Sequence, residues 1–236
     1  FYYINRSNSV ALVGQGNDIE TGEDINGNIK AITFDSHNFM LIGKSDGKVY
    51  YSTEHIKCYQ LLTTLSGSVT SLNFDKDNLL FIGTNKGLKI GTLTQTIPAN
   101  GGRITITFTE NTTINLPVEL TITNGSTYVT SIMTDDNNAT WIGTRRGLFR
   151  YFKGNFIRFT TKDGLPSNFV NDVAIRNTAI RYVATTTGIA KMIGTKIDEI
   201  IKTDNSELYS NNVKSVLWQE PSILWAGTHS KITQLT

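Results

Sequence analysis

The chain has 236 residues and a formal net charge of +2, and 18% of its residues are charged. So small a charge gives no indication of nucleic-acid binding, which needs a concentrated basic surface. The single cysteine, Cys58, excludes an internal disulfide, and we interpret it as a structural thiol. No stretch is apolar for long enough to cross a membrane, so we expect no direct membrane insertion.

Taken from the N-terminus, residues 1–4 and 10–13 are rich in aromatic and aliphatic side chains and predict two short strands. A pattern of paired strands then begins at Ile29. An alternating run of six or seven residues is followed by a turn rich in Asp and Asn, which tolerate left-handed φ. A second strand after each turn contains a small residue. These second strands begin at Met40, Leu80, Thr140, Arg181 and Leu224.

The paired strands recur about every forty residues, with one longer interval of about sixty, and a repeat of this length is typical of stacked supersecondary units. Each unit continues into a third strand, and a fourth is visible at residues 155–160. We name these strands A to D. A four-stranded unit cannot bury its own faces, but several units stacked radially can. The predicted fold class is therefore all-β, a β-propeller of four-stranded antiparallel blades, about five of them visible.

Two sets of small residues support this arrangement. The first set lies in strand B, where we expect inner strands to approach closely: Gly43, Gly83, Gly143, Ala184 and Gly227. The second set precedes strand C, where a positive φ is expected: Gly47, Gly87, Gly147 and Gly188.

One stretch carries a specific resemblance. Residues 129–168 contain Trp-Ile-Gly-Thr at 141–144 and Gly-Leu-Pro-Ser-Asn at 164–168. They resemble the propeller repeat of the sensor regions of two-component regulators. The resemblance extends over roughly residue 29 to the C-terminus, apart from one insertion. It implies a periplasmic or extracellular input domain that recognises glycan fragments, although this kind of repeat also serves secretion factors, enzymes and surface proteins.

The number of blades stays open at this point. Residues 1–4 and 10–13 align with strands C and D, while the C-terminus ends in strands A, B and most of C. Either the termini share a fifth blade in a small ring, or the 236 residues form one propeller domain that is part of a larger ring.

The longer interval reflects an insertion within residues 94–126, where alternation at residues 104–108 and 114–122 predicts one or two extra strands around a turn at Glu110 and Asn111. We interpret the insertion as an elongated outer hairpin. The alternative is a projecting arm that contacts a neighbouring subunit, because a long exposed edge invites pairing with another chain.

The candidate binding residues lie in the loops between strands B and C. These loops are basic, whereas the A–B turns carry Asp35, Asp75, Asp77, Asp135 and Asp136. We therefore expect one basic and one acidic face, and a basic funnel attracts anions. The basic candidates are Lys44, Lys86, Arg145, Arg146, His229 and Lys231.

These residues favour a non-catalytic recognition or sensing propeller that binds an acidic glycan or an acidic protein surface, and the resemblance implies a location outside the cytoplasm. One alternative is a structural or attachment component, such as part of a virion tail or surface appendage. The other is a lyase or hydrolase. The loops predict no catalytic residues, because Lys, Arg, Thr and Asn dominate them. The three histidines lack metal-ligand spacing, so we expect no metal and no cofactor.

Overall fold

The computed structural model describes residues 2–4, 10–12, 28–52, 59–96, 105–122 and 127–235. It divides into two compact units, residues 1–114 and 115–236, and each unit is described by itself below. The sequence predicted one propeller domain with an inserted hairpin. Both units are built from the same kind of antiparallel sheet, which we call a blade.

The first unit opens with a two-stranded antiparallel sheet, β1 (Tyr2–Ile4) and β2 (Val10–Leu12), at the positions predicted for strands C and D. Blade 1 follows as β3 (Ile29–Phe34), β4 (Met40–Lys44), β5 (Lys48–Ser52) and β6 (Tyr59–Thr64). Blade 2 contains β7 (Val69–Phe74), β8 (Leu79–Thr84), β9 (Gly87–Thr96) and β10 (Thr105–Glu110).

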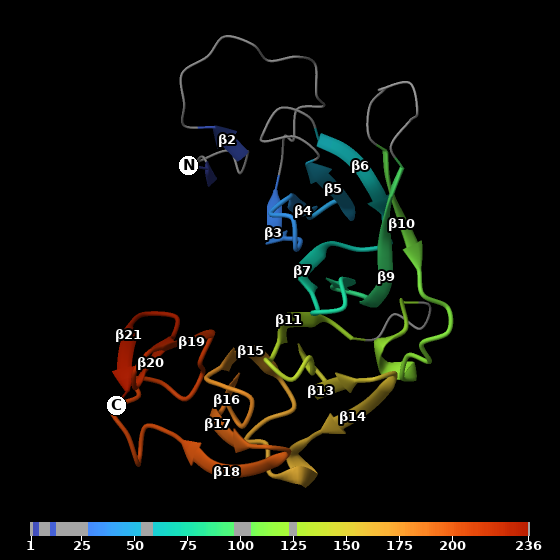
Figure 1. The fold of residues 1–236 in the computed structure, drawn as a ribbon. Helices are drawn as coiled ribbons and strands as arrows, with labels where there is room; N and C mark the ends of the chain where they lie inside the picture. Colours follow the sequence, from blue (N-terminus) through green and yellow to red (C-terminus); the bar gives the residue numbers. More distant parts are fainter. Residues whose placement is uncertain are drawn as a thin grey trace. The chain divides into compact units, whose positions relative to one another are not determined.

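The second unit contains three consecutive sheets (Figure 1). Blade 3 comprises β11 (Val129–Thr134), β12 (Thr140–Thr144), β13 (Gly147–Phe152) and β14 (Asn155–Phe159). Blade 4 comprises β15 (Val170–Ile175), β16 (Ile180–Thr185), β17 (Gly188–Ile193) and β18 (Lys196–Ile201). Blade 5 has three described strands, β19 (Ser215–Gln219), β20 (Ile223–Gly227) and β21 (Ile232–Leu235). The described part of the unit also contains the short 3-10 helices η1 (Val118–Leu120) and η3 (Thr161–Asp163).

The predicted fold class is confirmed. In every four-stranded blade the strands pair in chain order and antiparallel, so that strand A lies at one edge and strand D at the other. The expected glycine roles are also confirmed at individual positions. A Cβ on Gly43 would overlap the side chain of Val69 in the next blade. Gly147 has a φ of +118°, which few side chains tolerate.

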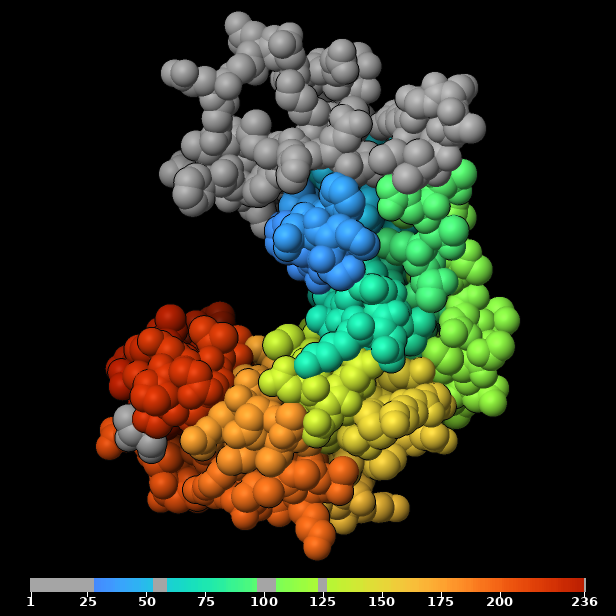
Figure 2. Space-filling model, in the orientation of Figure 1, coloured from blue at the N-terminus to red at the C-terminus, as the bar shows by residue number. Residues whose placement is uncertain are grey.

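The hydrophobic core lies between successive blades. In the second unit, Trp141 and Phe159 of blade 3 pack against Val173 and Met192 of blade 4. Tyr182 of blade 4 belongs in the same way to a cluster that includes residues of blade 5. Figure 2 shows these blades as successive bands of colour from yellow-green to red. Because each sheet gives one face to each neighbour, inner strands such as β12 and β16 are buried on both sides.

The Gly-Leu-Pro-Ser-Asn element at residues 164–168 connects blades 3 and 4. Leu165 is buried in the core between these blades. The backbone carbonyl of Asn168 accepts from the Gly147 amide at 2.7 Å, and its side-chain oxygen accepts from the Thr161 amide at 2.9 Å. The element that carries the family resemblance therefore fixes the chain between one blade and the next.

The insertion is accommodated in two ways. In the first unit, β9 is ten residues long and pairs with β10, which is the D strand of blade 2. In the second unit, residues 115–122 contain η1 where the alternation had predicted a strand, and Pro117, which lacks a backbone N–H, lies just before it. Leu120 is buried, and Glu119 bonds Arg158 of β14 at 2.8 Å. Residues 97–104, between β9 and β10, lie outside the described part, so the contact role remains a prediction.

Asp172 on β15 joins all three blades of the second unit. Its carboxylate accepts hydrogen bonds from Ser131 Oγ of blade 3 at 2.8 Å and from the Val216 amide of blade 5 at 3.0 Å. A third bond comes from the Val173 amide at 2.9 Å. Burial raises the pKa of Asp172, and these hydrogen bonds oppose that increase. The carboxylate thus satisfies donors from each of the neighbouring inner strands.

We expect Asp172→Ala to destabilise the protein by about 2–4 kcal/mol, because the Ser131 hydroxyl and the Val216 amide would lose their partner. Chemical denaturation monitored by circular dichroism measures this loss. Ser131→Ala, which removes one donor and leaves the carboxylate its other bonds, is the matched control and should cost about 1 kcal/mol. Equal losses in the two variants would contradict the assigned role.

Candidate functional site

The B–C turns at one end of blades 2, 3 and 4 share one local design. In blade 3, Thr144 Oγ1 donates to the Gly147 carbonyl at 2.7 Å and accepts from the Arg146 amide at 3.0 Å. The same pair of bonds forms at Thr84 and at Thr185. The threonine and the glycine thereby fix the backbone of the turn. The two residues between them are exposed in blades 2 and 3, whereas Thr187 of blade 4 donates to the Pro166 carbonyl.

Arg145 and Arg146 occupy these two positions in blade 3, and both are exposed. Arg145 stacks on Tyr128, with its guanidinium carbon 4.4 Å from the ring centroid. The carbonyl of Arg146 accepts from Arg158 Nε at 2.9 Å. Within the described residues neither Arg145 nor Arg146 has an acidic side chain in salt-bridge range. Both guanidinium groups therefore remain available to an anion.

Blade 5 presents a second cation at the same end of the unit. Lys231 replaces the turn glycine, and its carbonyl accepts from the Thr228 amide at 2.8 Å. Lys231 Nζ lies 4.3 Å from the ring centroid of Tyr209, which is 53% exposed. His229 is exposed in the same turn. Two cation–aromatic pairs, Arg145 with Tyr128 and Lys231 with Tyr209, thus lie at the B–C end of the second unit.

The two basic candidates in the first unit, Lys86 and Lys44, differ in exposure. Lys86 is exposed, and its Nζ donates to Ser66 Oγ at 3.3 Å. Lys44 is the last residue of β4 and is only 8% exposed. Its Nζ lies 3.4 Å from Asp46 Oδ2. Burial acts to raise the pKa of Asp46, but the Lys48 amide and the charge of Lys44 outweigh it, so that this pKa is lowered. Lys44 is therefore a paired residue rather than a free ligand contact.

The prediction of an acidic face is wrong for three of the five aspartates on which it was based. Asp135 is 3% exposed, and its Oδ1 accepts from the amides of Asn137 and Ala139, both at 3.0 Å. Asp35 and Asp75 make the same two bonds in their own turns. Asp77 and Asp136 remain exposed. The carboxylates of Asp35, Asp75 and Asp135 therefore accept hydrogen bonds within their own turns and do not form an acidic surface.

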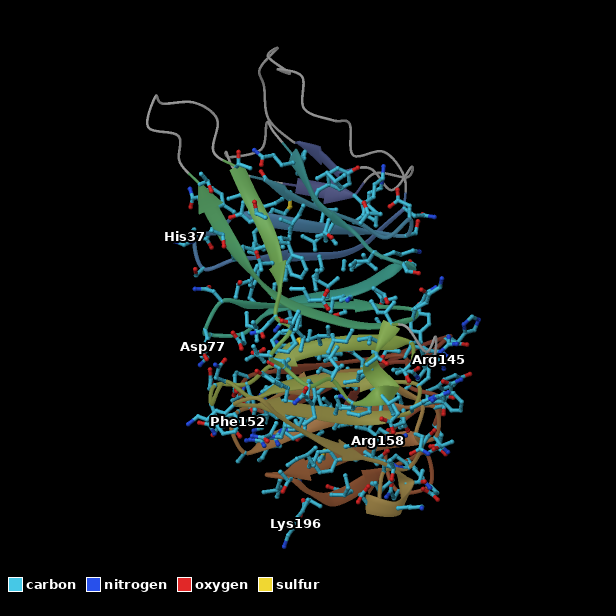
Figure 3. The ribbon with its side chains drawn as sticks, turned by 90° about the vertical axis from the view of Figure 1, so that its right-hand side faces the viewer. His37, Asp77, Arg145, Phe152, Arg158 and Lys196 are labelled. Carbon is cyan, nitrogen blue, oxygen red and sulfur yellow. The ribbon has the colours of Figure 1, made fainter. Side chains whose placement is uncertain are left out.

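The opposite end of the second unit also carries cations, which the sequence pattern had not emphasised. Lys153 and Lys196 are exposed in the C–D turns of blades 3 and 4. Figure 3 shows Arg145 at one end of the strands, with Phe152 and Lys196 toward the other. The second unit is thus not divided into a basic and an acidic end. The B–C end differs by its adjacent arginine pair, because the other end has cation–aromatic contacts of its own, such as that of Lys153 with Phe152.

A buried ionic cluster in the second unit was missed by the sequence analysis. Arg181 of blade 4 is 2% exposed, and its guanidinium lies 4.1 Å from the ring centroid of Trp141. Its Nη2 lies 4.0 Å from Asp135 Oδ2, and Trp141 Nε1 donates to that same oxygen at 3.0 Å. Burial lowers the pKa of Arg181, and Asp135 opposes the decrease. The cluster holds blade 3 to blade 4, since it lies within their shared core.

Two kinds of feature are absent from the part of the chain that the structure describes. Among the described residues, no group of three or more His, Cys, Asp or Glu side chains is placed to hold a metal ion. No helix in the described ranges is long and apolar enough to span a membrane. Cys58 and His55 lie outside the described residues.

No protein-family model matches the chain, and no curated protein matches it either. Several solved structures are similar to the chain. The extracellular domain of the hybrid two-component system BT4673 from B. thetaiotaomicron matches with a TM-score of 0.67 at 19% identity, over 98% of this chain and 28% of that one. PorZ, a surface component of the type-IX secretion system of Porphyromonas gingivalis, matches with a TM-score of 0.62 at 15% identity, over 97% and 35%.

A third similar structure is an enzyme. Virginiamycin B lyase from Staphylococcus aureus matches with a TM-score of 0.65 at 15% identity, over 100% of this chain and 72% of that one. At such identities the likeness shows the fold. The chain spans less than a third of the length of the BT4673 domain. Extracellular domains of two-component systems are among the structural neighbours, in agreement with the resemblance found in the sequence.

We expect Asp135→Ala to lower stability by about 3–5 kcal/mol, because it leaves Arg181 buried without its counter-charge and removes the acceptor of two turn amides and of Trp141. Thermal or urea denaturation measures the change. Asp136→Ala, a substitution of the exposed neighbour in the same turn, should change stability by no more than about 0.5 kcal/mol. Similar effects of the two substitutions would contradict the structural role of Asp135.

Proposed function

We propose that the protein is a non-catalytic recognition propeller that binds an anionic partner through the B–C end of its second unit. The observation that carries this proposal is the exposed pair Arg145 and Arg146, whose guanidinium groups lack acidic partners among the described residues. Arginine forms planar, bidentate hydrogen bonds with carboxylate, sulfate-like and phosphate groups. An adjacent pair suits a partner with repeated negative charges.

An acidic glycan fits this end better than an acidic protein surface. Tyr128 and Tyr209 lie beside the cations, and Phe169 is 52% exposed at the same end of the unit. Exposed aromatic rings give apolar faces on which sugar rings can stack, while Arg and Lys bind the acidic groups. Recognition of an acidic protein surface is the alternative, and it would depend on charge without needing these rings.

The sensing role and the location outside the cytoplasm belong to the same proposal. They are supported by the likeness to extracellular domains of two-component systems. The lyase and PorZ show that the same fold also occurs in an enzyme and in a secretion component. No arrangement of residues in the described part favours either alternative over recognition.

The double variant Arg145→Glu, Arg146→Glu should bind an acidic polysaccharide such as polygalacturonate at least tenfold more weakly than the unmodified protein, because repulsion replaces two charge-assisted contacts. Calorimetry at two salt concentrations measures this. Binding to the unmodified protein should also weaken as salt rises.

The matched control is Lys153→Glu, Lys196→Glu, which changes the charge equally at the opposite end of the same unit. It should leave affinity within about twofold. If both double variants lose affinity equally, the protein responds to net charge and the assigned site is wrong. A variant Tyr209→Ala that loses glycan binding but retains binding to an acidic protein would support the glycan over the protein surface.

A further inference from the structure

A small cleft of about 120 Å³ lies within the first unit, between blades 1 and 2. Tyr51 of blade 1 and Phe74 of blade 2 contribute aromatic rings to its lining, and Leu93 and Ile106 add aliphatic side chains. Asp35, which begins the A–B turn of blade 1, lines it as well. A space of this size equals the share of about four water molecules in the liquid, so it can hold one small polar group and part of an apolar stem.

The insertion of blade 2 builds one wall of this cleft. The third strands of blades 3 and 4, β13 and β17, are six residues long, whereas β9 has ten. The additional residues, 93–96, include Leu93 and Gln95, which line the cleft. Gln95 pairs with Ile106 of β10, so both strands of the elongated hairpin contribute to the wall. The longer repeat thus gives blade 2 a surface that the shorter third strands of blades 3 and 4 cannot form.

The carboxylate of Asp35 has one acceptor position left. Its Oδ1 accepts from the backbone amides of His37 and Phe39, both at 2.9 Å. Its Oδ2 accepts from the Tyr51 hydroxyl at 2.7 Å. Burial, together with this hydrogen bond, raises the pKa of Tyr51, so the hydroxyl stays a donor. Because a carboxylate offers about four lone-pair positions, the three bonds leave one position on Oδ2.

The negative charge of Asp35 lacks a permanent counter-charge among the described residues. Its side chain is only 10% exposed. Within the described part, the basic group in salt-bridge range is His37, whose Nδ1 lies 3.7 Å from Asp35 Oδ2 and whose side chain, at the surface in Figure 3, is 71% exposed. An imidazole is a cation only when it is protonated. Since a buried charge without a partner is costly, the cleft favours a cationic ligand.

Blade 3 shows which cation completes a carboxylate of this kind. Asp135 accepts the same two turn amides, and its Oδ2 accepts from an aromatic side chain, that of Trp141. The Oδ2 of Asp35 likewise accepts from Tyr51. In blade 3 a guanidinium is added, because Arg181 Nη2 lies 4.0 Å from Asp135 Oδ2 and its guanidinium carbon lies 4.1 Å from the centroid of the Trp141 ring. A carboxylate and an aromatic ring together therefore accommodate a guanidinium in this fold.

The first unit has the carboxylate and the ring but lacks this arginine. Arg181 is paired with Ile175 across strands β15 and β16. The residue that is paired in the same way with Phe74, across β7 and β8, is Leu80. Blade 2 thus supplies an aliphatic side chain at the position from which blade 4 supplies the guanidinium.

We propose that the cleft between blades 1 and 2 binds a guanidinium group carried on a short aliphatic stem. The guanidinium donates to Asp35 Oδ2 and lies against the ring of Tyr51, and the stem packs on Leu93 and Ile106. A guanidinium is weakly hydrated and stacks on aromatic rings, whereas an ammonium is strongly hydrated, so an apolar cleft with one carboxylate favours the guanidinium. This cation site is separate from the anion site at the arginine pair.

Two small probes with the same stem, butylguanidine and butylamine, test the head group. Nuclear magnetic resonance of the isotope-labelled protein should show saturable shifts of the His37 and Gln95 signals on addition of butylguanidine. Butylamine should bind at least threefold more weakly, since its ammonium is more strongly hydrated. Absence of saturation with butylguanidine, or equal affinity for the two probes, overturns the proposal.

A charge-removing variant tests the carboxylate. Asp35→Asn should weaken butylguanidine binding at least fivefold, because the amide keeps an oxygen for the turn but loses the charge. Asp75→Asn is the matched control, since Asp75 accepts the same two turn amides in blade 2 but does not line the cleft. It should leave the affinity within about twofold. Equal losses in the two variants contradict the role of Asp35.

A second pair of variants leaves the turn intact. Gln95→Arg should weaken binding at least fivefold, because Gln95 is exposed and lines the cleft, where an arginine can reach the carboxylate of Asp35. Thr94→Arg adds the same charge at the neighbouring exposed residue, which does not line the cleft, and should leave the affinity within about twofold. If both variants weaken binding equally, the probe responds to net charge and the assigned site is wrong.

A blocked Gly-Arg-Gly peptide distinguishes two sources of the guanidinium. Affinity within about threefold of that for butylguanidine would assign the cleft to an arginine side chain of a protein, and weaker binding would assign it to a small molecule. Lys57, outside the described residues, is a cation of the chain itself. If Lys57→Ala raises the affinity for butylguanidine more than threefold, this lysine competes for the cleft, and the assignment to an external ligand is overturned.

Discussion

A single partly buried carboxylate, that of Asp172, links the inner strands of the three blades in the second unit. It accepts from Ser131 Oγ on one side and from the Val216 amide on the other. Thr130, which donates to the Val170 carbonyl, and Asn171, which donates to the Val213 carbonyl, add further hydrogen bonds between the same blades. The cores between the blades are apolar and non-directional, whereas these hydrogen bonds are directional. The apolar cores hold the blades together, and these hydrogen bonds set their relative height, which in turn brings the B–C turns of the unit to one end.

Much of the fold could be predicted from the sequence. The forty-residue period, the alternating strands and the glycines depend on local backbone geometry, and the structure confirms them. Burial of individual charges depends on tertiary contacts and could not be predicted. Asp135 and Asp136 are adjacent in one turn, yet Asp135 is buried under Trp141 while Asp136 is exposed. Lys44 was likewise expected in a loop, but β4 extends through it. The turn explains why Arg145 and Arg146 are exposed, whereas Lys44 is buried. The binding role of the arginine pair stays a prediction.

The charged residues of the second unit consequently fall into two groups. Asp135, Asp172 and Arg181 are surrounded by donors and acceptors of the blades and serve the fold. Arg145 and Arg146 are held outward by the hydroxyl of Thr144 and serve no such contact with their guanidinium groups. A rigid turn that presents unpaired cations needs little reorganisation to bind an anion. The buried group therefore supports the exposed group by fixing the strands on which the turn is built.

Binding at Arg145 and Arg146 depends on exposed charge, which salt screens over about 8–10 Å. The blades that carry this turn are held together by apolar burial, which salt at physiological strength hardly affects. Salt therefore weakens the attraction of an anion without loosening the strands on which Thr144 holds the turn. The recognition end and the blades that support it thus respond to different conditions.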